Sequence, residues 1–309
     1  RGVHGTPLRV VALLWGAARL LLVIPSAPPL LAAIVDLAFL PAVGLLLLPF
    51  FRDPELKKER IFYVFFTLLF VGNALVHGEI LGWFPGYARQ GLYLGLNTIL
   101  LIIIFIGGRV IPFFTESSIA RAQPRSRAPV EIGAYVSAAA YLATDFLASG
   151  SRAHAAIAFL AAGFHFLRLL GWQVPRVRRI PLVWVLHLGY LWLVVGFALA
   201  GLATFGLFAP SLAIHAFTVG GLGVIVYGMI SRVGLGHTGR RLHPAAWTVV
   251  GYISLNLAAL VRAVVAILLP EIYVATLVAS GGLWILAFAI FVLVYAPILV
   301  STRADGQPG

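Results

Sequence analysis

Long apolar runs are the feature that most constrains what this chain can fold into. A bilayer is crossed by roughly 20 mostly apolar residues in a helix. Backbone amides and carbonyls in hydrocarbon must be satisfied internally, and the runs are too long and lack the period-two alternation of barrel strands. We therefore predict an all-α polytopic transmembrane bundle of about ten helices. The ten runs are 8–24, 30–50, 61–79, 89–113, 130–148, 153–172, 181–206, 211–232, 245–268 and 272–301.

Composition agrees with a lipid environment. Hydrophobic residues make up 61% of the chain and charged residues 10%, whereas soluble domains are about a quarter charged. The net charge of +12 raises the possibility of nucleic-acid binding. The basic residues, however, form short clusters between apolar runs, as in loops beside a membrane, so we expect no nucleic-acid partner.

The basic clusters predict an orientation. They follow every second run, and the connections between them hold only Arg89 and Arg152. Basic loops face the cytoplasm, so both termini are predicted to be cytoplasmic. The connections are too short for an extramembrane domain, and residues 1–309 are predicted to form a single transmembrane domain. The clusters are Arg52, Lys57, Lys58 and Arg60; Arg121, Arg125 and Arg127; Arg176, Arg178 and Arg179; Arg232, Arg240 and Arg241; and Arg303.

The lack of cysteine excludes several kinds of site. Disulfides, iron–sulfur clusters, thiolate-ligated haem and covalently attached haem all need cysteine, and the chain has none. With Met229 as the single methionine, any metal must be held by histidine, carboxylate or backbone oxygen. We find no phosphate-binding loop, serine nucleophile elbow, zincin helix or catalytic carboxylate pair.

Ionisable residues at membrane depth are candidates for function. Arg19 and Asp36 fall at similar depth in the first two runs, and we expect them to form a structural ion pair across the hairpin. Arg262 is expected either to extend to the interface or to meet Glu271.

The histidines form two sets by depth. His77 matches His215, and His165 matches His187 in the opposite half of the membrane. A b-type haem takes two axial imidazoles from facing helices at one depth, so both pairs are candidate haem or metal ligands. Hydrogen bonding of each imidazole to a neighbouring helix is the alternative.

Two glycine-containing runs carry further candidates. Gly107, Gly108 and Pro112 predict a broken helix that places Arg109 near the cytoplasmic face, where it can bind a haem propionate or a lipid headgroup. The glycine-rich run 229–241 places His237 near Arg240 as a possible anion or metal site.

The 211–232 run also has a face with little bulk. It suits either close helix packing or a slot for a flat macrocycle. Its glycines are Gly220, Gly221, Gly223 and Gly228.

Three stretches resemble the NnrS family of bacterial membrane proteins. They read GGRVIPFFT at 107–115, LHLGYLW at 186–192, and HAFTVG at 215–220 followed by GHTGR at 236–240. The resemblance covers essentially the whole chain. It implies a bacterial inner-membrane protein with haem and copper, linked to denitrification and to protection against nitric oxide. It also implies about two further amino-terminal helices with a histidine-rich motif, after which this chain begins. The positions that match family motif residues are Arg109, His187, His215 and His237, with His77 as a further match.

These observations lead to one function and two alternatives. We expect a membrane protein of nitric-oxide metabolism that holds haem b, with copper as a second cofactor, nitric oxide as the small-molecule ligand and membrane lipid around it. Whether it is an enzyme, and which redox partner it uses, stay open. A transporter or channel for a small or anionic solute is the main alternative, since transporters use broken helices at midplane sites. A scaffold for other membrane proteins is the third.

Overall fold

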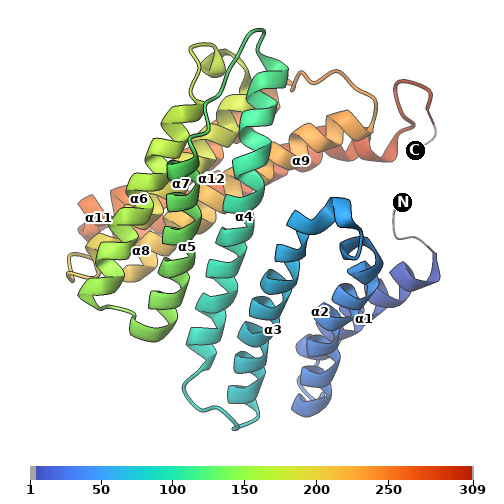
Figure 1. The fold of residues 1–309 in the computed structure, drawn as a ribbon, viewed down its shortest axis with the longest axis vertical. Coiled ribbons are helices and arrows are strands. Elements are labelled where there is room, and N and C mark those ends of the chain that lie inside the picture. The colour runs from blue at the N-terminus through green and yellow to red at the C-terminus, as the bar shows by residue number, and fades with distance from the viewer. Residues whose placement is uncertain (1–4, 308–309) are drawn as a thin grey trace. The chain divides into compact units, whose positions relative to one another are not determined.

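The structure is a computed structural model that describes residues 5–307, and within that range it is helical without strands (Figure 1). The predicted all-α membrane fold is confirmed, because each of the ten apolar runs coincides with a helical segment. The long helices are α1 (Thr6–Val23), α2 (Pro29–Phe51), α3 (Ile61–Ile80), α4 (Ala88–Ser118), α5 (Ala128–Ala148), α6 (Arg152–Trp172), α7 (Pro181–Ala203), α9 (Val224–His237), α10 (Ala246–Ala259) and α12 (Tyr273–Val300). Short segments complete them: η1 (Pro54–Arg60), η2 (Val177–Arg179), α8 (Pro210–His215), η3 (Ala216–Gly223), η4 (Leu260–Val265), α11 (Ala266–Leu268) and η5 (Pro270–Ile272).

Nine helices of the described chain are long and apolar enough to cross a membrane. Helix α5 is not among these nine, and it carries Glu131 and Asp145 within its 21 residues. Helix α5 nevertheless packs closely against α6, one of the nine. The chain is therefore a multi-pass membrane protein, and the orientation of its termini stays a prediction.

The chain divides into two compact units between Ile102 and Ile103. In the first unit α1 packs on α2 and α2 packs on α3. In the second unit α7 is the central helix, because it contacts α6, α8, η3 and α9 and buries Leu186, Tyr190, Leu193 and Phe197. The polar residues described below are placed within one unit or the other.

Helix α4 corrects one expectation. The glycine pair and Pro112 predicted a broken helix, yet α4 runs without interruption from Ala88 to Ser118. Proline removes one helix hydrogen bond, and in a membrane neighbouring groups satisfy the carbonyl that it frees. The break that supported a transporter is therefore absent at this position.

Two π-helical turns, which were not expected from the sequence, interrupt other long helices. Segment η3 follows His215 directly, and segment η4 contains Arg262. The two turns pack against each other. π-Helical turns often occur at functional sites, because they shift the helix register and redirect side chains.

The glycine face around η3 is used for close helix packing. A methyl group at Gly220 would overlap the Trp192 ring, and one at Gly221 would overlap Leu193. At Gly228 the same group would press on Val185 and Leu186. Side chains of α7 thus fill the space that a macrocycle would need on this face, and the close-packing interpretation is the one the structure supports.

Candidate functional site

A buried carboxylate organises the polar residues of the first unit. Asp36 on α2 pairs with Arg19 on α1, which confirms the predicted ion pair. Asn73 donates to Oδ2 of Asp36 at 2.8 Å, and Nε2 of His77 lies 3.0 Å from the same oxygen. His77 is thus held by one ring nitrogen against a carboxylate, an arrangement that also orients metal-ligating histidines through the other nitrogen.

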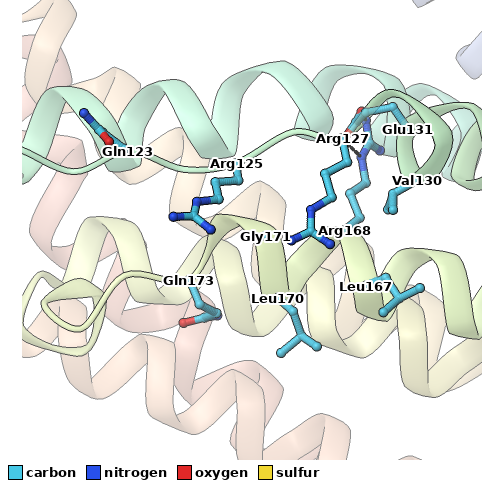
Figure 2. A pocket seen from close by; sticks show the side chains of 10 residues that line it. All are labelled: Gln123, Arg125, Arg127, Val130, Glu131, Leu167, Arg168, Leu170, Gly171 and Gln173. Carbon is cyan, nitrogen blue, oxygen red and sulfur yellow. Dashed lines mark hydrogen bonds and ion pairs between the residues drawn. The ribbon is translucent and has the colours of Figure 1, made fainter.

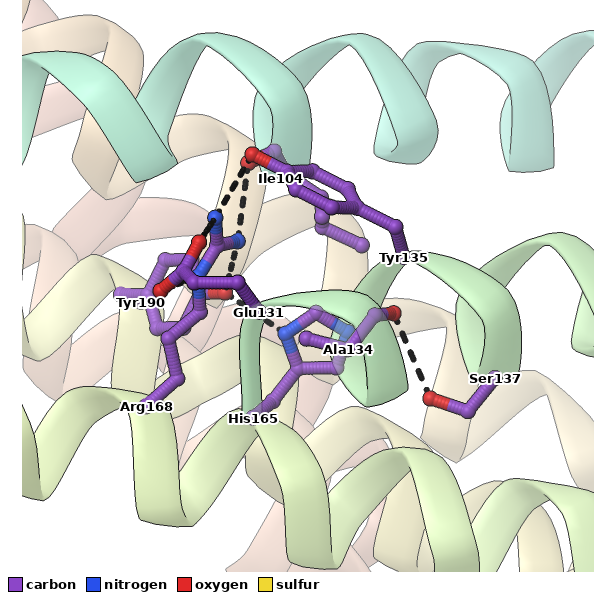
Figure 3. Close-up of polar contacts among 8 residues, drawn as sticks. All are labelled: Ile104, Glu131, Ala134, Tyr135, Ser137, His165, Arg168 and Tyr190. Carbon is purple, nitrogen blue, oxygen red and sulfur yellow. Dashed lines mark hydrogen bonds and ion pairs between the residues drawn. The ribbon is translucent and has the colours of Figure 1, made fainter. Parts of the chain in front are cut away.

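A buried guanidinium organises the second unit. Arg168 on α6 has no exposed side-chain surface, and it forms a two-pronged ion pair with Glu131 on α5. Its remaining hydrogens go to Tyr135 Oη at 2.7 Å, Tyr190 Oη at 3.0 Å and the Ile104 carbonyl at 3.2 Å (Figure 3). An arginine at this depth needs such a complete set of acceptors, because an unsatisfied charge there is very costly.

Gly108 explains how the guanidinium reaches the backbone of α4. A methyl group at this position would overlap Nη2 and Cζ of Arg168. Because the side chain is missing, the guanidinium lies against the helix and reaches the Ile104 carbonyl. The glycine in the 107–115 motif is therefore a docking surface for Arg168, not a hinge.

The Arg168 network determines the tautomer of His165. Tyr190 accepts a hydrogen from Arg168, so its own hydroxyl hydrogen is available for His165 Nδ1 at 2.6 Å. An imidazole that accepts at Nδ1 carries its hydrogen on Nε2. Nε2 of His165 forms no hydrogen bond in the described structure, and the Ala134 carbonyl lies beside the ring (Figure 3). The lone pair of His165 is therefore on Nδ1, where it accepts the hydrogen bond from Tyr190.

His187 has the opposite tautomer. Its Nδ1 lies 3.1 Å from the Val183 carbonyl, and a carbonyl only accepts, so the hydrogen is on Nδ1. Nε2 of His187 is buried, carries the lone pair and makes no hydrogen bond, although the Trp172 carbonyl lies near the ring. A free Nε2 with Nδ1 bonded to a backbone carbonyl is the form in which histidine binds a metal ion or haem iron. The donor chemistry of His187 therefore fits the haem that the sequence led us to expect.

His165 and His187 do not face one another. His165 contacts α7 at Tyr190 and Phe197, and its ring stacks on the Phe197 ring with centroids 5.2 Å apart. These residues lie three and ten positions beyond His187, which is roughly 5 and 15 Å along a helix. The two imidazoles are thus offset along α7 and do not form the two axial ligands of one iron.

The other predicted histidine pair spans the two units. His77 belongs to the first unit, and half-buried His215 ends α8 in the second. Their pairing stays a prediction. Arg262, in the π-turn that packs on α8, lies over the Tyr273 ring at 5.2 Å, not against Glu271. Nη1 of Arg262 is buried and has no hydrogen-bond partner among the described residues.

The predicted site joins an exposed residue, His237, and a half-buried one, Arg240, and both are tied to residues 301–305. Arg240 donates to the Ser301 hydroxyl at 2.8 Å, and Arg303 donates to the His237 carbonyl at 3.0 Å. Arg303 also hydrogen-bonds Asp305, which lowers the pKa of that carboxyl to about 2. The polar groups of this loop therefore hold the chain end in place.

Arg109 lies on the exposed side of α4. Its guanidinium stacks on the Phe105 ring at 4.3 Å. Its predicted role in holding a propionate or a headgroup stays a prediction.

Glu131 and Arg168 form the most connected polar group of the second unit, and neither was predicted from the sequence. Arg168 lies inside the apolar run 153–172. It also follows His165 by three residues, a spacing that puts both on one helix face. These two signals were present in the sequence and mark Arg168 as a buried partner.

Arg232 was counted as a loop charge. The structure buries it on α9, with its guanidinium 3.9 Å from the centroid of the Phe114 ring. Its hydrogen bonds in the described structure are two long contacts of 3.5 Å to the Ser118 hydroxyl.

Within residues 5–307 no group of three or more His, Asp or Glu side chains is arranged to hold a metal ion.

Comparison with known proteins identifies a family: a family model described as NnrS protein matches residues 1–303. No curated protein and no solved structure matches the chain.

Proposed function

The chain belongs to the NnrS family, and from this premise we propose that it is a haem-binding membrane protein of nitric-oxide metabolism with His187 as an axial ligand. The observation that carries the proposal is the state of the His187 ring. It is buried on the central helix, its Nδ1 faces the Val183 carbonyl, which can only accept a hydrogen, and its Nε2 has no hydrogen-bond partner among the described residues. No other predicted histidine combines these three properties in the part of the chain that the structure describes.

The chain's own residues supply orientation and a dry environment. The Val183 carbonyl holds the tautomer and the angle of the His187 ring. Trp172 and Leu186 are fully buried near this level of the bundle, so water is excluded and polar interactions are strong. Bound haem would supply an iron that can bind nitric oxide. Because this sequence has no cysteine, the haem would be held without a thioether bond or a thiolate ligand, as haem b is.

None of three other predicted histidines is assigned as a second ligand of the same iron. His165 carries its hydrogen on Nε2, and His77 belongs to the first unit, where Asp36 holds its Nε2. His215 is half-buried, but Gly189 lies against Ile225 and Gly196 lies against Phe217, which puts His215 roughly 15 Å along α7 from His187. The propionates are assigned to Arg109, with Arg240 as the weaker choice because it already binds Ser301.

Copper is proposed separately. It rests on the family resemblance, because no group of three or more His, Asp or Glu side chains among the described residues marks its site. Elemental analysis of the purified protein after dialysis against a chelator tests it: retained stoichiometric copper is expected, and protein without copper would contradict the copper assignment.

The spectrum of the purified protein tests haem binding. We expect haem-loaded protein to show a Soret band that shifts on reduction with dithionite and again with nitric oxide. His187→Ala is expected to remove most of that band, and added imidazole to restore part of it. His243→Ala is the matched control, because His243 is exposed in a loop. A wild-type protein with no bound haem overturns the proposal, and a His187→Ala protein with an unchanged spectrum overturns the ligand assignment.

A further inference from the structure

A cavity at one end of the α5–α6 hairpin has an unusual concentration of guanidinium groups. Its volume is about 550 Å³, and it is lined by Arg125, Arg127 and Arg168 (Figure 2). Arg168 is neutralised by Glu131 in the floor. Arg125 and Arg127 are exposed, and no described side chain forms an ion pair with either. The cavity therefore offers two uncompensated positive charges.

The loop that carries these arginines is fixed in place. The Arg125 amide donates to the Gly171 carbonyl at 2.7 Å. A methyl group at Gly171 would overlap the Arg125 carbonyl, so this close approach requires glycine. In Figure 2 both guanidinium groups point from the loop toward the end of α6. The backbone beneath the two arginines is therefore held against α6, and their exposed side chains can close on an anion in the cavity.

An apolar groove follows the cavity along the same hairpin. It has a volume of about 610 Å³, and apart from Ser137 its walls are apolar. Its sides come from Ile132, Val136 and Ala140 on α5 and from Ile157, Leu160 and Phe164 on α6. Val130 and Leu167 line the cavity, one turn or less from Gly133 and Phe164 in the groove. The headgroup-sized polar site and the apolar groove thus occupy successive turns of the same two helices.

We propose that this surface binds one anionic phospholipid, with its phosphate at Arg125 and Arg127 and an acyl chain in the groove along α5 and α6. The charge at the mouth of the groove selects this occupant. A basic pocket between helices at the membrane surface favours an anionic headgroup, and an apolar groove that faces the bilayer is filled by a lipid chain. The proposal is independent of haem binding.

Lipid retention measured by native mass spectrometry tests the proposal on the detergent-purified full chain. Phosphatidylglycerol and phosphatidylcholine with the same acyl chains are added after delipidation. We expect phosphatidylglycerol to bind at least about tenfold more tightly, since each nearby cationic side chain contributes about a factor of five. Arg125→Gln with Arg127→Gln is expected to remove that preference. Arg176→Gln with Arg179→Gln is the matched control, because these exposed arginines follow the same helix α6 and lie outside the cavity.

Two further experiments distinguish a bound lipid from a free phosphate ion in the cavity and from a second copy of the chain on the groove. Val136→Trp fills the groove and is expected to reduce phosphatidylglycerol retention severalfold, whereas Leu293→Trp, at another exposed apolar position, leaves it unchanged. Inorganic phosphate at millimolar concentration is expected not to displace the lipid. Equal retention by the cavity variant and its control overturns the proposal. Displacement by phosphate, or a change of oligomeric state with Val136→Trp and no loss of lipid, also overturns it.

Discussion

Each of the two units buries one charged side chain among hydrogen-bond partners, and the two buried charges have opposite signs. In the first unit a carboxylate, Asp36, is buried and surrounded by donors from Arg19, Asn73 and His77. In the second unit a guanidinium, Arg168, is buried and surrounded by acceptors. The first network reaches the surface of its unit through Arg19, whose side chain is 46% exposed, whereas the Arg168 side chain is 0% exposed.

This difference bears on the histidines. The acceptor Asp36 takes up Nε2 of His77, and the donor Tyr190 takes up Nδ1 of His165. Each network therefore uses its own histidine as a structural partner. His187 lies outside both hydrogen-bond networks and keeps its Nε2 lone pair. The networks thus separate histidines that complete a charge cluster from a buried histidine whose Nε2 has no partner among the described residues.

The largest expected effect is the loss of the carboxylate beside the buried cation. Glu131→Gln leaves Arg168 without its counter-charge, and we expect a loss of about 3 kcal/mol in the free energy of unfolding. Denaturant titration in one detergent measures it. The double variant Glu131→Met with Arg168→Met removes both charges and is expected to recover most of the loss. A single variant within about 1 kcal/mol of wild type would contradict the buried-pair interpretation.

The fold and the Arg19–Asp36 pair of the first network could be predicted from the sequence, but the contacts of Asn73 and His77 with Asp36 could not. The apolar runs determine where helices lie, because each must satisfy its backbone inside lipid. The Arg19–Asp36 pair follows from depth alone, since neighbouring helices in a hairpin bring equal depths together. Depth does not identify the partner of Arg168, because Glu131 lies near the end of its helix, where a carboxylate is ordinarily solvated.

The histidine tautomers and the continuity of α4 could not be predicted from the sequence, for a different reason. The hydrogen position on His165 or His187 depends on which group each ring meets across the bundle. The predicted break at Pro112 was wrong because local propensity was weighed without the surroundings of α4. Both are properties of packing, not of any single segment.

A smaller effect is expected for the first network. Asp36→Asn keeps an acceptor oxygen for Asn73 or His77, and Arg19 can turn its half-exposed side chain toward the interface. We expect a loss of about 2 kcal/mol in the same unfolding assay. Because Arg19 is half-exposed and Arg168 is fully buried, we expect Asp36→Asn to cost less unfolding free energy than Glu131→Gln. An equal or larger loss would show that the exposure of Arg19 does not relieve the unpaired charge.

The smallest effect is expected at the contact between Arg168 and the backbone of α4. Arg168 donates to the Ile104 carbonyl there, and the Asp36 network has no such contact with a backbone carbonyl among its described hydrogen bonds. Gly108→Ala places a methyl group against the Arg168 guanidinium, and we expect a loss of about 1 kcal/mol from overpacking. Gly107→Ala is the matched control on the preceding residue, because its methyl group would lie 3.6 Å from Ile111 in ordinary contact. Alanine also favours a helix over glycine, so this control is expected to be neutral or slightly stabilising. If Gly108→Ala also stabilises the protein, Arg168 does not depend on close contact with α4, and the guanidinium is held by Glu131 and the tyrosines alone.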